Sequence, residues 1–226
     1  MGTNKGYLYG YEVSIQREGR KVVYKLEESC KGTNKRGSAP ITTVKFLQRS
    51  TFIAFIIGTQ LQTISFHDLG SQQTFKKKAS KFCVNNAVYK TGPGASAFDQ
   101  ICAADEDKKV TFYAFKPQDL KFEEDRELPG FSLPQVPLQL IWDDQLLYVG
   151  AKKAFYVVVS KTGEIKQKVE HTISVTNPLM AMSNKGKCLI SVPKSGEAVF
   201  FEAERGQRSK PRIPLDSSKT VVALAL

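Results

Sequence analysis

The segment DDQLLYVGAKKAFYVVVSKTGE, Asp143–Glu164, holds two bursts of apolar residues separated by a short gap of glycine, alanine and lysine. Tyrosine, valine and phenylalanine dominate the bursts, and these residue types favour β-strands. The second burst, AFYVVV, is apolar at consecutive positions, so both faces of that strand are expected to be buried. The segment therefore predicts a tight pair of strands inside a packed β structure.

Four other segments follow the same plan of apolar strand, short polar turn and apolar strand: MGTNKGYLYGYEV, FIIGTQLQTISFH, ICAADEDKKVTFYAF and LISVPKSGEAVFF. The second strands of the five copies are spaced by 54, 49, 45 and 43 residues, and they begin near Tyr7, Leu61, Val110, Phe155 and Ala198. Periods of about 40 to 50 residues are typical of β-propeller blades.

Further strands are predicted around these pairs. The preceding segments are ITTVKFL, KFCVNNAVY, LQLIW and PLMAM, and the more polar following segments include KVVYKLEES, SQQTFKKKA and EIKQKVEH. We therefore predict an all-β chain of about five four-stranded blades, with apolar inner strands and polar outer ones. A β-sandwich with regular turns is the alternative. We expect residues 1–226 to form one propeller region that is incomplete at both ends, because the chain finishes on the strand-like KTVVALAL.

The composition favours a non-enzymatic protein with reduced thiols. The four cysteines, Cys30, Cys83, Cys102 and Cys188, have no close spacing of the kind that binds zinc or forms a redox pair. The longest apolar run has seven residues, far fewer than the roughly 20 that a membrane-spanning helix needs. We expect a cytoplasmic protein without a metal or cofactor.

Motifs that resemble catalytic or cofactor sites are weak. TGPGASA, at residues 91–97, has the spelling of a dinucleotide-binding turn, but a strand-like segment follows where that turn needs a helix. His67 next to Asp68 suggests a hydrolase triad, yet no nucleophile elbow occurs, and the only other histidine is His171. An acidic cluster in KFEEDRELPG is interpreted as a solvated loop. Its members are Glu123, Glu124, Asp125 and Glu127.

The positive charge is concentrated in the first part of the chain. Residues 1–90 carry a net charge of +10, whereas residues 91–226 carry +1. Such asymmetry attracts anionic partners, although a solvated outer strand explains a run of lysines equally well. The residues predicted to contact an anionic membrane or a partner are Lys31, Lys35, Arg36, Lys76, Lys77, Lys78 and Lys81. Few aromatic residues interleave with these lysines, so nucleic acid is not the expected partner.

The stretch FSLPQVPLQLIWDDQLLYVGAKKAFYVVVSKTGEI, Phe131–Ile165, resembles a citron-homology (CNH) domain of the HOPS/CORVET vesicle-tethering subunits. The Pro-x-Val-Pro lead-in at Pro134–Pro137, the strand ending in Trp142 and the strand pair after it carry the resemblance. ISFHDLGSQQ and GASAFDQICAADEDKKVTFYAF are similar to earlier blades of the family, in the same order. The resemblance implies a propeller of about seven blades without enzymatic activity.

The resemblance also implies partners and a location. It points to Rab-type small GTPases and sister tethering subunits, and to the surface of late endosomes, vacuoles or lysosomes. One alternative is a regulatory CNH domain beside a kinase or exchange-factor domain, and another is a basic nucleic-acid-binding scaffold.

Overall fold

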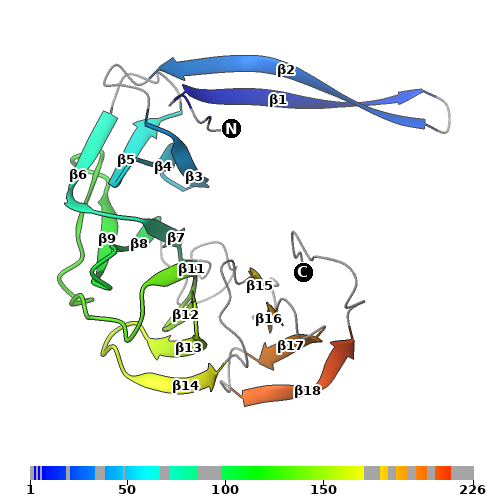
Figure 1. Ribbon diagram of the computed structural model, residues 1–226. Helices are drawn as coiled ribbons and strands as arrows, with labels where there is room; N and C mark the ends of the chain where they lie inside the picture. Colours follow the sequence, from blue (N-terminus) through cyan, green and yellow to red (C-terminus); the bar gives the residue numbers. More distant parts are fainter. Residues whose placement is uncertain are drawn as a thin grey trace. The chain divides into compact units, whose positions relative to one another are not determined.

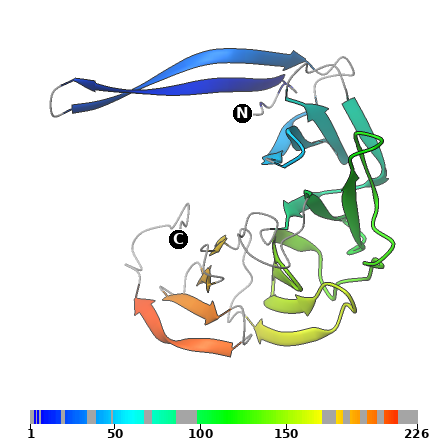
Figure 2. The same ribbon diagram turned by 180° about the vertical axis from the view of Figure 1, so that it is seen from behind.

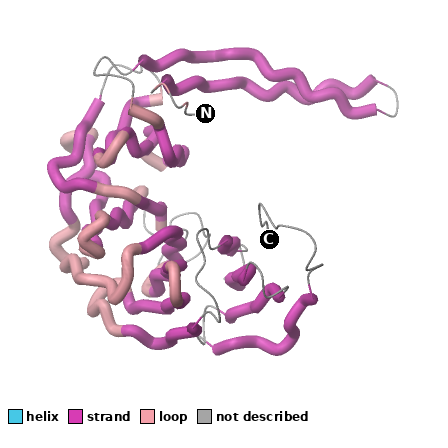
Figure 3. Tube along the Cα trace, viewed as in Figure 1, coloured by secondary structure: helices cyan, strands magenta, loops and turns pink. Residues whose placement is uncertain are grey.

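The computed structural model describes Thr3, Lys5 and residues 7–18, 21–33, 39–47, 49–66, 72–85 and 98–170, together with the backbone of four later strands. The described part consists of strands, turns and loops without a helix (Figure 3). The chain divides into two compact units. The first comprises Met1–Phe46 and Thr51–Lys77, and the second comprises Leu47–Ser50 and Lys78–Leu226.

The first unit begins with a two-stranded antiparallel sheet. β1 (Tyr7–Glu18) and β2 (Lys21–Thr33) form a long twisted ribbon, seen from both sides in Figures 1 and 2. Thr3 joins this ribbon to the next sheet, because its backbone N–H donates to the Tyr7 carbonyl (2.9 Å) and its carbonyl accepts from the Ile41 N–H (2.9 Å).

The second sheet of this unit has four strands in the order β3-β4-β5-β6, and their bounds are Ile41–Leu47, Phe52–Ile57, Gln60–Ser65 and Gln72–Lys78. All six residues of β4 are buried. Apolar side chains from β4 and β5 form the local core with Leu8, and Ile53, Phe55, Ile57 and Ile64 belong to it. Gly58 makes the tight turn between β4 and β5 at φ 58°, a left-handed conformation that glycine adopts without a steric penalty.

The second unit contains two fully described four-stranded sheets. The first has the order β10-β9-β8-β7, with bounds Lys121–Glu124, Val110–Lys116, Gln100–Ala104 and Lys81–Val84. The second has the order β11-β12-β13-β14, with bounds Pro137–Asp143, Leu146–Ala151, Ala154–Val159 and Ile165–Glu170. Each sheet is an up-and-down meander, as a propeller blade is.

The chain-first strands of successive sheets lie side by side in this unit (Figure 1). β7 contacts β11, and a parallel bridge joins Asn85 to Trp142. β11 in turn contacts β15 (Leu179–Met182), which starts a further four-stranded sheet. The other strands of that sheet are β16 (Lys187–Val192), β17 (Glu197–Glu202) and β18 (Gln207–Pro214). Inner strands gathered in this way are the arrangement of blades around a common axis.

A mostly apolar core links the sheets β7–β10 and β11–β14. It includes Phe112 and Trp142, whose ring centroids are 5.0 Å apart, together with Val149 and Tyr156. The connection from β10 to β11 packs against the same core through Leu128, Phe131 and Leu133. Thus the runs that are apolar at consecutive positions form strands whose two faces are both buried.

Most of the strands predicted from sequence are confirmed. The second strands of four copies begin at Gln60, Val110, Ala154 and Glu197, each within one residue of the prediction. The first copy differs, because Tyr7–Glu18 pairs with Lys21–Thr33 in a two-stranded sheet and no strand is described before Tyr7. KTVVALAL lies outside the described residues.

Candidate interaction surface

The described residues hold no cluster of metal-binding side chains. Among them, no group of three or more histidine, cysteine or acidic side chains is arranged to hold a metal ion. Of the motifs weighed from sequence, His67, Asp68, His171 and the TGPGASA segment at residues 91–97 all lie outside the described residues. No helix in the described part is long and apolar enough to cross a membrane.

Two of the four cysteines are buried in the second unit as free thiols. Cys83 in β7 and Cys102 in β8 are opposite each other across the strand pair. Burial raises the pKa of the Cys102 thiol well above its ordinary value, and the neighbouring Cys83 raises it further. Because the thiolate is the reactive form, these two residues act as small apolar core residues.

The acidic cluster differs from the predicted loop. Glu123 and Glu124 belong to β10, and only the residues from Asp125 onward form the loop. The strand is short and has Phe122 as its only buried residue, so it carries no clear alternation in sequence. Lys121 Nζ forms an ion pair with Glu123 Oε1 at 3.3 Å. Asp125 Oδ1 accepts a hydrogen bond from the Glu127 backbone N–H in the turn that follows the strand. The carboxylates of Glu123 and Asp125 therefore make local contacts.

The lysines predicted as contacts fall into three groups. Lys76, Lys77 and Lys78 end the outer strand β6 and are exposed, whereas Lys81 is half-buried at the start of β7. Lys31 lies in β2, and Lys35 and Arg36 lie outside the described residues. The structure thus supports a linear basic element along β6, and the contacts themselves stay a prediction.

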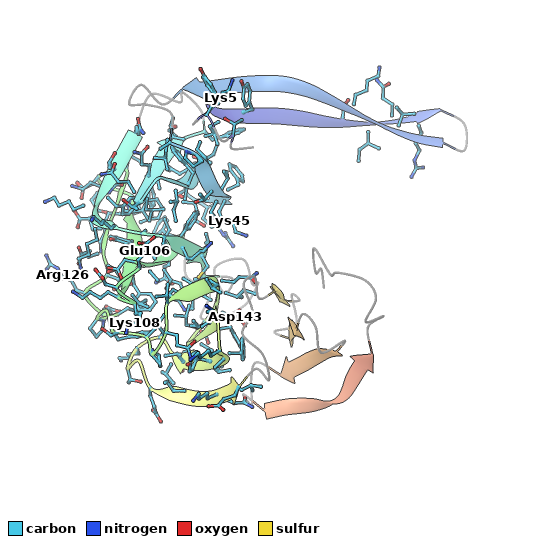
Figure 4. All side chains as sticks on the ribbon, viewed as in Figure 1. Lys5, Lys45, Glu106, Lys108, Arg126 and Asp143 are labelled. Atoms are coloured by element: carbon cyan, nitrogen blue, oxygen red, sulfur yellow. The ribbon has the colours of Figure 1, made fainter. Side chains whose placement is uncertain are left out.

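In the sheet β3–β6, basic side chains lie in β3 and β6, and the described residues of the sheet include no acidic one. Residues 39–66 and 72–85 include Lys45 and Arg49 besides the lysines of β6 and β7, and they contain no aspartate or glutamate. Figure 4 labels Lys45 at the end of β3. By contrast, the turn between β8 and β9 mixes both signs, with Glu106 and Lys108 among its residues (Figure 4). An excess of basic over acidic residues in a segment favours contact with an acidic partner.

An exposed aromatic pair in the first unit was missed by the sequence reasoning. Phe46 at the end of β3 and Phe66 after β5 are 48% and 42% exposed, and their ring centroids are 5.2 Å apart in an edge-to-face arrangement. An edge-to-face arrangement is a favoured geometry for two aromatic rings, and aromatic residues at the centre of protein interfaces contribute much of the binding energy. No sequence pattern near either residue signals the pair.

Buried polar side chains in the second unit hold turns in place. Asn85 accepts a hydrogen bond from the Asp144 N–H (2.9 Å) and donates to Gln100 (2.8 Å). The buried Asp99 carboxylate accepts from the backbone N–H of Ser50 (2.6 Å) and from its hydroxyl (2.7 Å). These buried polar groups are hydrogen-bonded to one another or to nearby backbone, as buried polar groups usually are.

Solved structures resemble the whole chain in fold. The WD40 domain of Neurospora crassa Pan2 superposes with a TM-score of 0.60 at 12% identity, covering 95% of this chain and 61% of that domain. The AfRom2 CNH domain superposes with a TM-score of 0.56 at 14% identity, covering 99% of this chain and 75% of that chain.

No protein-family model and no curated protein sequence matches the chain. The fold is a WD40/CNH-like β-propeller fold, with several four-stranded antiparallel sheets as blades. The expected β-propeller fold is therefore confirmed and the sandwich alternative is excluded, but the described part has four four-stranded sheets where about five blades were predicted.

Proposed function

We propose that the chain is a non-catalytic interaction module of a vesicle-tethering subunit of the HOPS/CORVET kind, as in the vacuolar-sorting subunit called Vam six. The observation that carries the proposal is the agreement of two likenesses. The segment Phe131–Ile165 resembles the CNH domains of tethering subunits in sequence, and the whole chain resembles a solved CNH domain in fold. The module would act on late endosomes, vacuoles or lysosomes by binding a Rab-type GTPase and sister subunits.

The segment that carries the sequence resemblance is also well anchored. Gln135, inside the Pro-x-Val-Pro lead-in, donates through its Nε2 to the Tyr156 hydroxyl (2.8 Å), and its Oε1 accepts from the Lys153 N–H (3.0 Å). Trp142 is 1% exposed. The characteristic residues thus build the blade, which leaves the recognition of partners to other, exposed residues.

The exposed aromatic pair is the best-supported place for the GTPase. Phe46 and Phe66 present two apolar rings that are already ordered against each other. An ordered aromatic anchor loses little conformational entropy on binding. Lys45, next to Phe46, would steer an acidic partner surface toward it.

Binding to a late-endosomal Rab-type GTPase, loaded with GTP or GDP, tests the proposal. The GTP-loaded form is expected to be retained by the immobilised chain, and the GDP-loaded form much less. Replacing Phe46 and Phe66 with alanine is expected to weaken binding by about tenfold or more. Leu120→Ala is the matched control, because Leu120 is an exposed apolar residue (69%) in the other unit. Equal failure of both nucleotide states would contradict the GTPase assignment.

A regulatory CNH domain beside a kinase or exchange-factor domain is equally compatible with the similarity to the AfRom2 CNH domain. The two functions differ in what the rest of the protein carries. A helical solenoid after the propeller favours the tethering subunit, whereas a kinase or exchange-factor domain favours the regulatory one. Sequencing the transcript on both sides of these residues separates them.

A further inference from the structure

Cys83 in β7 and Cys102 in β8 occupy directly opposite positions of an antiparallel strand pair, so their side chains lie on the same face. The Asn85 N–H donates to the Gln100 carbonyl (3.1 Å), which makes these two residues a hydrogen-bonded pair. Hydrogen-bonded pairs recur every second position, so Cys83 and Cys102 form the next one, with an expected Cα separation of about 5.5 Å. A disulfide bond needs about 4.4 to 6.8 Å. The strand pair can therefore take a disulfide without a change of register.

The side chains of the two cysteines are already neighbours. Burial, and then a hydrogen bond with Cys83, raise the pKa of the Cys102 thiol, and this hydrogen bond places the two sulfur atoms next to each other. Both strands are also held on their other sides, because β8 pairs with β9 and β7 contacts β11. Neither strand can move far when a bond forms between them. Any misfit therefore stays in the disulfide itself, which makes it easy to reduce.

The register brings together only two of the four cysteines. Cys30 pairs with Gly10, and Cys188 pairs with Met182 on one side and Phe201 on the other. Cys83 and Cys102 are 19 positions apart in the sequence, so spacing alone did not reveal them as a pair. The fold thus selects one pairing out of the six that four cysteines allow.

Burial controls when this pair can react. Cys83 is 5% exposed and Cys102 is 0% exposed, so in the closed, reduced chain both belong to the core. The thiolate is the reactive form, and it requires contact with water. β7 has only four residues, and short segments of this kind open locally at a lower free energy than the whole domain. A small oxidant therefore reaches the sulfur atoms when β7 separates from β8.

We propose that Cys83 and Cys102 are a site of reversible covalent modification, at which hydrogen peroxide forms a disulfide that fastens β7 to β8. One sulfur attacks a peroxide oxygen, the O–O bond breaks, and a sulfenic acid and one water form. The second sulfur attacks the sulfenic sulfur, the S–O bond breaks, and a second water leaves. The two thiols lose two electrons and two protons, and the peroxide takes up both. Thiols such as glutathione reverse the bond by exchange.

The disulfide would act on the junction between two sheets of the second unit. Asn85, two positions after Cys83, forms the parallel bridge to Trp142 and accepts a hydrogen bond from the Asp144 N–H (2.9 Å). Fastening β7 to β8 restrains the segment that makes these contacts with β11. The site does not depend on GTPase binding.

The test treats the folded 226-residue chain with hydrogen peroxide, blocks the remaining thiols with N-ethylmaleimide and maps the tryptic peptides by mass spectrometry. Cys83 lies in the tryptic peptide 82–90 and Cys102 in the peptide 91–108. A link between these two peptides is the expected main product, and dithiothreitol is expected to remove it. The double variant Cys30→Ala, Cys188→Ala is the control that keeps the link, whereas Cys83→Ala loses it. Mapping the wild-type chain needs no variant, so a folding defect of Cys83→Ala does not affect the result.

Hydrogen exchange measures the fastening itself. Oxidation is expected to slow amide exchange in β7 at least about tenfold, and to leave β4, in the first unit, within about twofold of the reduced chain. Separate oxidation of the two cysteines without a link overturns the proposal. Equal yields of links that include Cys30 or Cys188, or a link that forms only in the urea-unfolded chain, overturn it as well. A link that leaves exchange in β7 unchanged contradicts the fastening of β7.

Discussion

Replacing Gly130 with alanine is expected to destabilise the second unit severely. A methyl group at this position would lie 2.3 Å from the Val110 carbonyl oxygen and 3.5 Å from its carbon. Both atoms are backbone atoms of β9, so no change of side-chain rotamer can relieve the contact. The connection between β10 and β11 must therefore move away from β9 as a unit.

The displacement breaks contacts of the residues that follow Gly130. The Val110 N–H donates to the Phe131 carbonyl (2.8 Å), and the Leu133 N–H donates to the Lys108 carbonyl (2.8 Å). Each such bond stabilises the fold by about 1 kcal/mol net. Leu133 is 4% exposed, and moving it out of the core costs about 1.5 to 3 kcal/mol. The expected loss in the free energy of unfolding is about 3 to 5 kcal/mol, a large part of the stability of a domain.

Urea unfolding followed by tryptophan fluorescence measures this loss directly. Trp142 is the only tryptophan, and it is buried in the core against which the connection packs. Gly58→Ala is the matched control for the glycine substitution itself. Its methyl group would lie 3.7 Å from the nearest atom, so it is expected to lose only about 1 to 2 kcal/mol through its positive φ, measured by circular dichroism. A Gly130→Ala loss below about 1 kcal/mol would refute the steric reasoning.

Three further predictions follow from the second unit. Gly163 has φ 73°, and a methyl group there would lie 2.8 Å from the Phe131 ring. Gly163→Ala is therefore expected to lower the free energy of unfolding by about 2 to 4 kcal/mol in urea. If the ring is the obstacle, adding Phe131→Ala should recover part of this loss. Burial and then a nearby carboxylate raise the pKa of Tyr113 to about 12. The contribution of Tyr113 to the free energy of unfolding is therefore complete below pH 10, the ordinary tyrosine pKa, and is expected to be lost as the pH rises toward 12. A Tyr113→Phe variant whose stability keeps the same pH dependence would contradict this. Asp99→Ala removes the acceptor of two hydrogen bonds from Ser50 and is expected to lower the free energy of unfolding by about 2 to 3 kcal/mol, measured with heat or urea. Asp99→Asn is expected to cost less. Equal losses for the two variants would argue against the hydrogen bonds as the cause.

The blade plan was predictable because it depends on local chemistry. Runs such as Phe52–Ile57 and Ala154–Val159 are apolar at every position, and strands buried on both faces need this. The spacing of the copies then indicated separate sheets. The short strand β10 was not predictable, because its one buried residue, Phe122, gives no periodic signal. Its two glutamates are residue types that are common in loops.

The surface features depend on contacts between distant segments. Nothing in the sequence near Phe46 indicates that its ring meets Phe66 and stays exposed, because the distance between them is set by the register of β3, β4 and β5. The same holds for Gly130, whose need for glycine arises from the carbonyl of Val110 across the sheet. Sequence periodicity reports which face of a strand is buried, and not which other element covers it.

The separation between folding residues and charged residues makes the proposed binding sites testable. The sheet β3–β6 is held by the six buried residues of β4 and their partners in β5, whereas the lysines of β6 are exposed. Exposed charges of this kind change stability by less than about 0.5 kcal/mol when replaced. Charge reversal on β6 should therefore leave the melting temperature almost unchanged. A lowered melting temperature would instead show that these lysines take part in holding the sheet together.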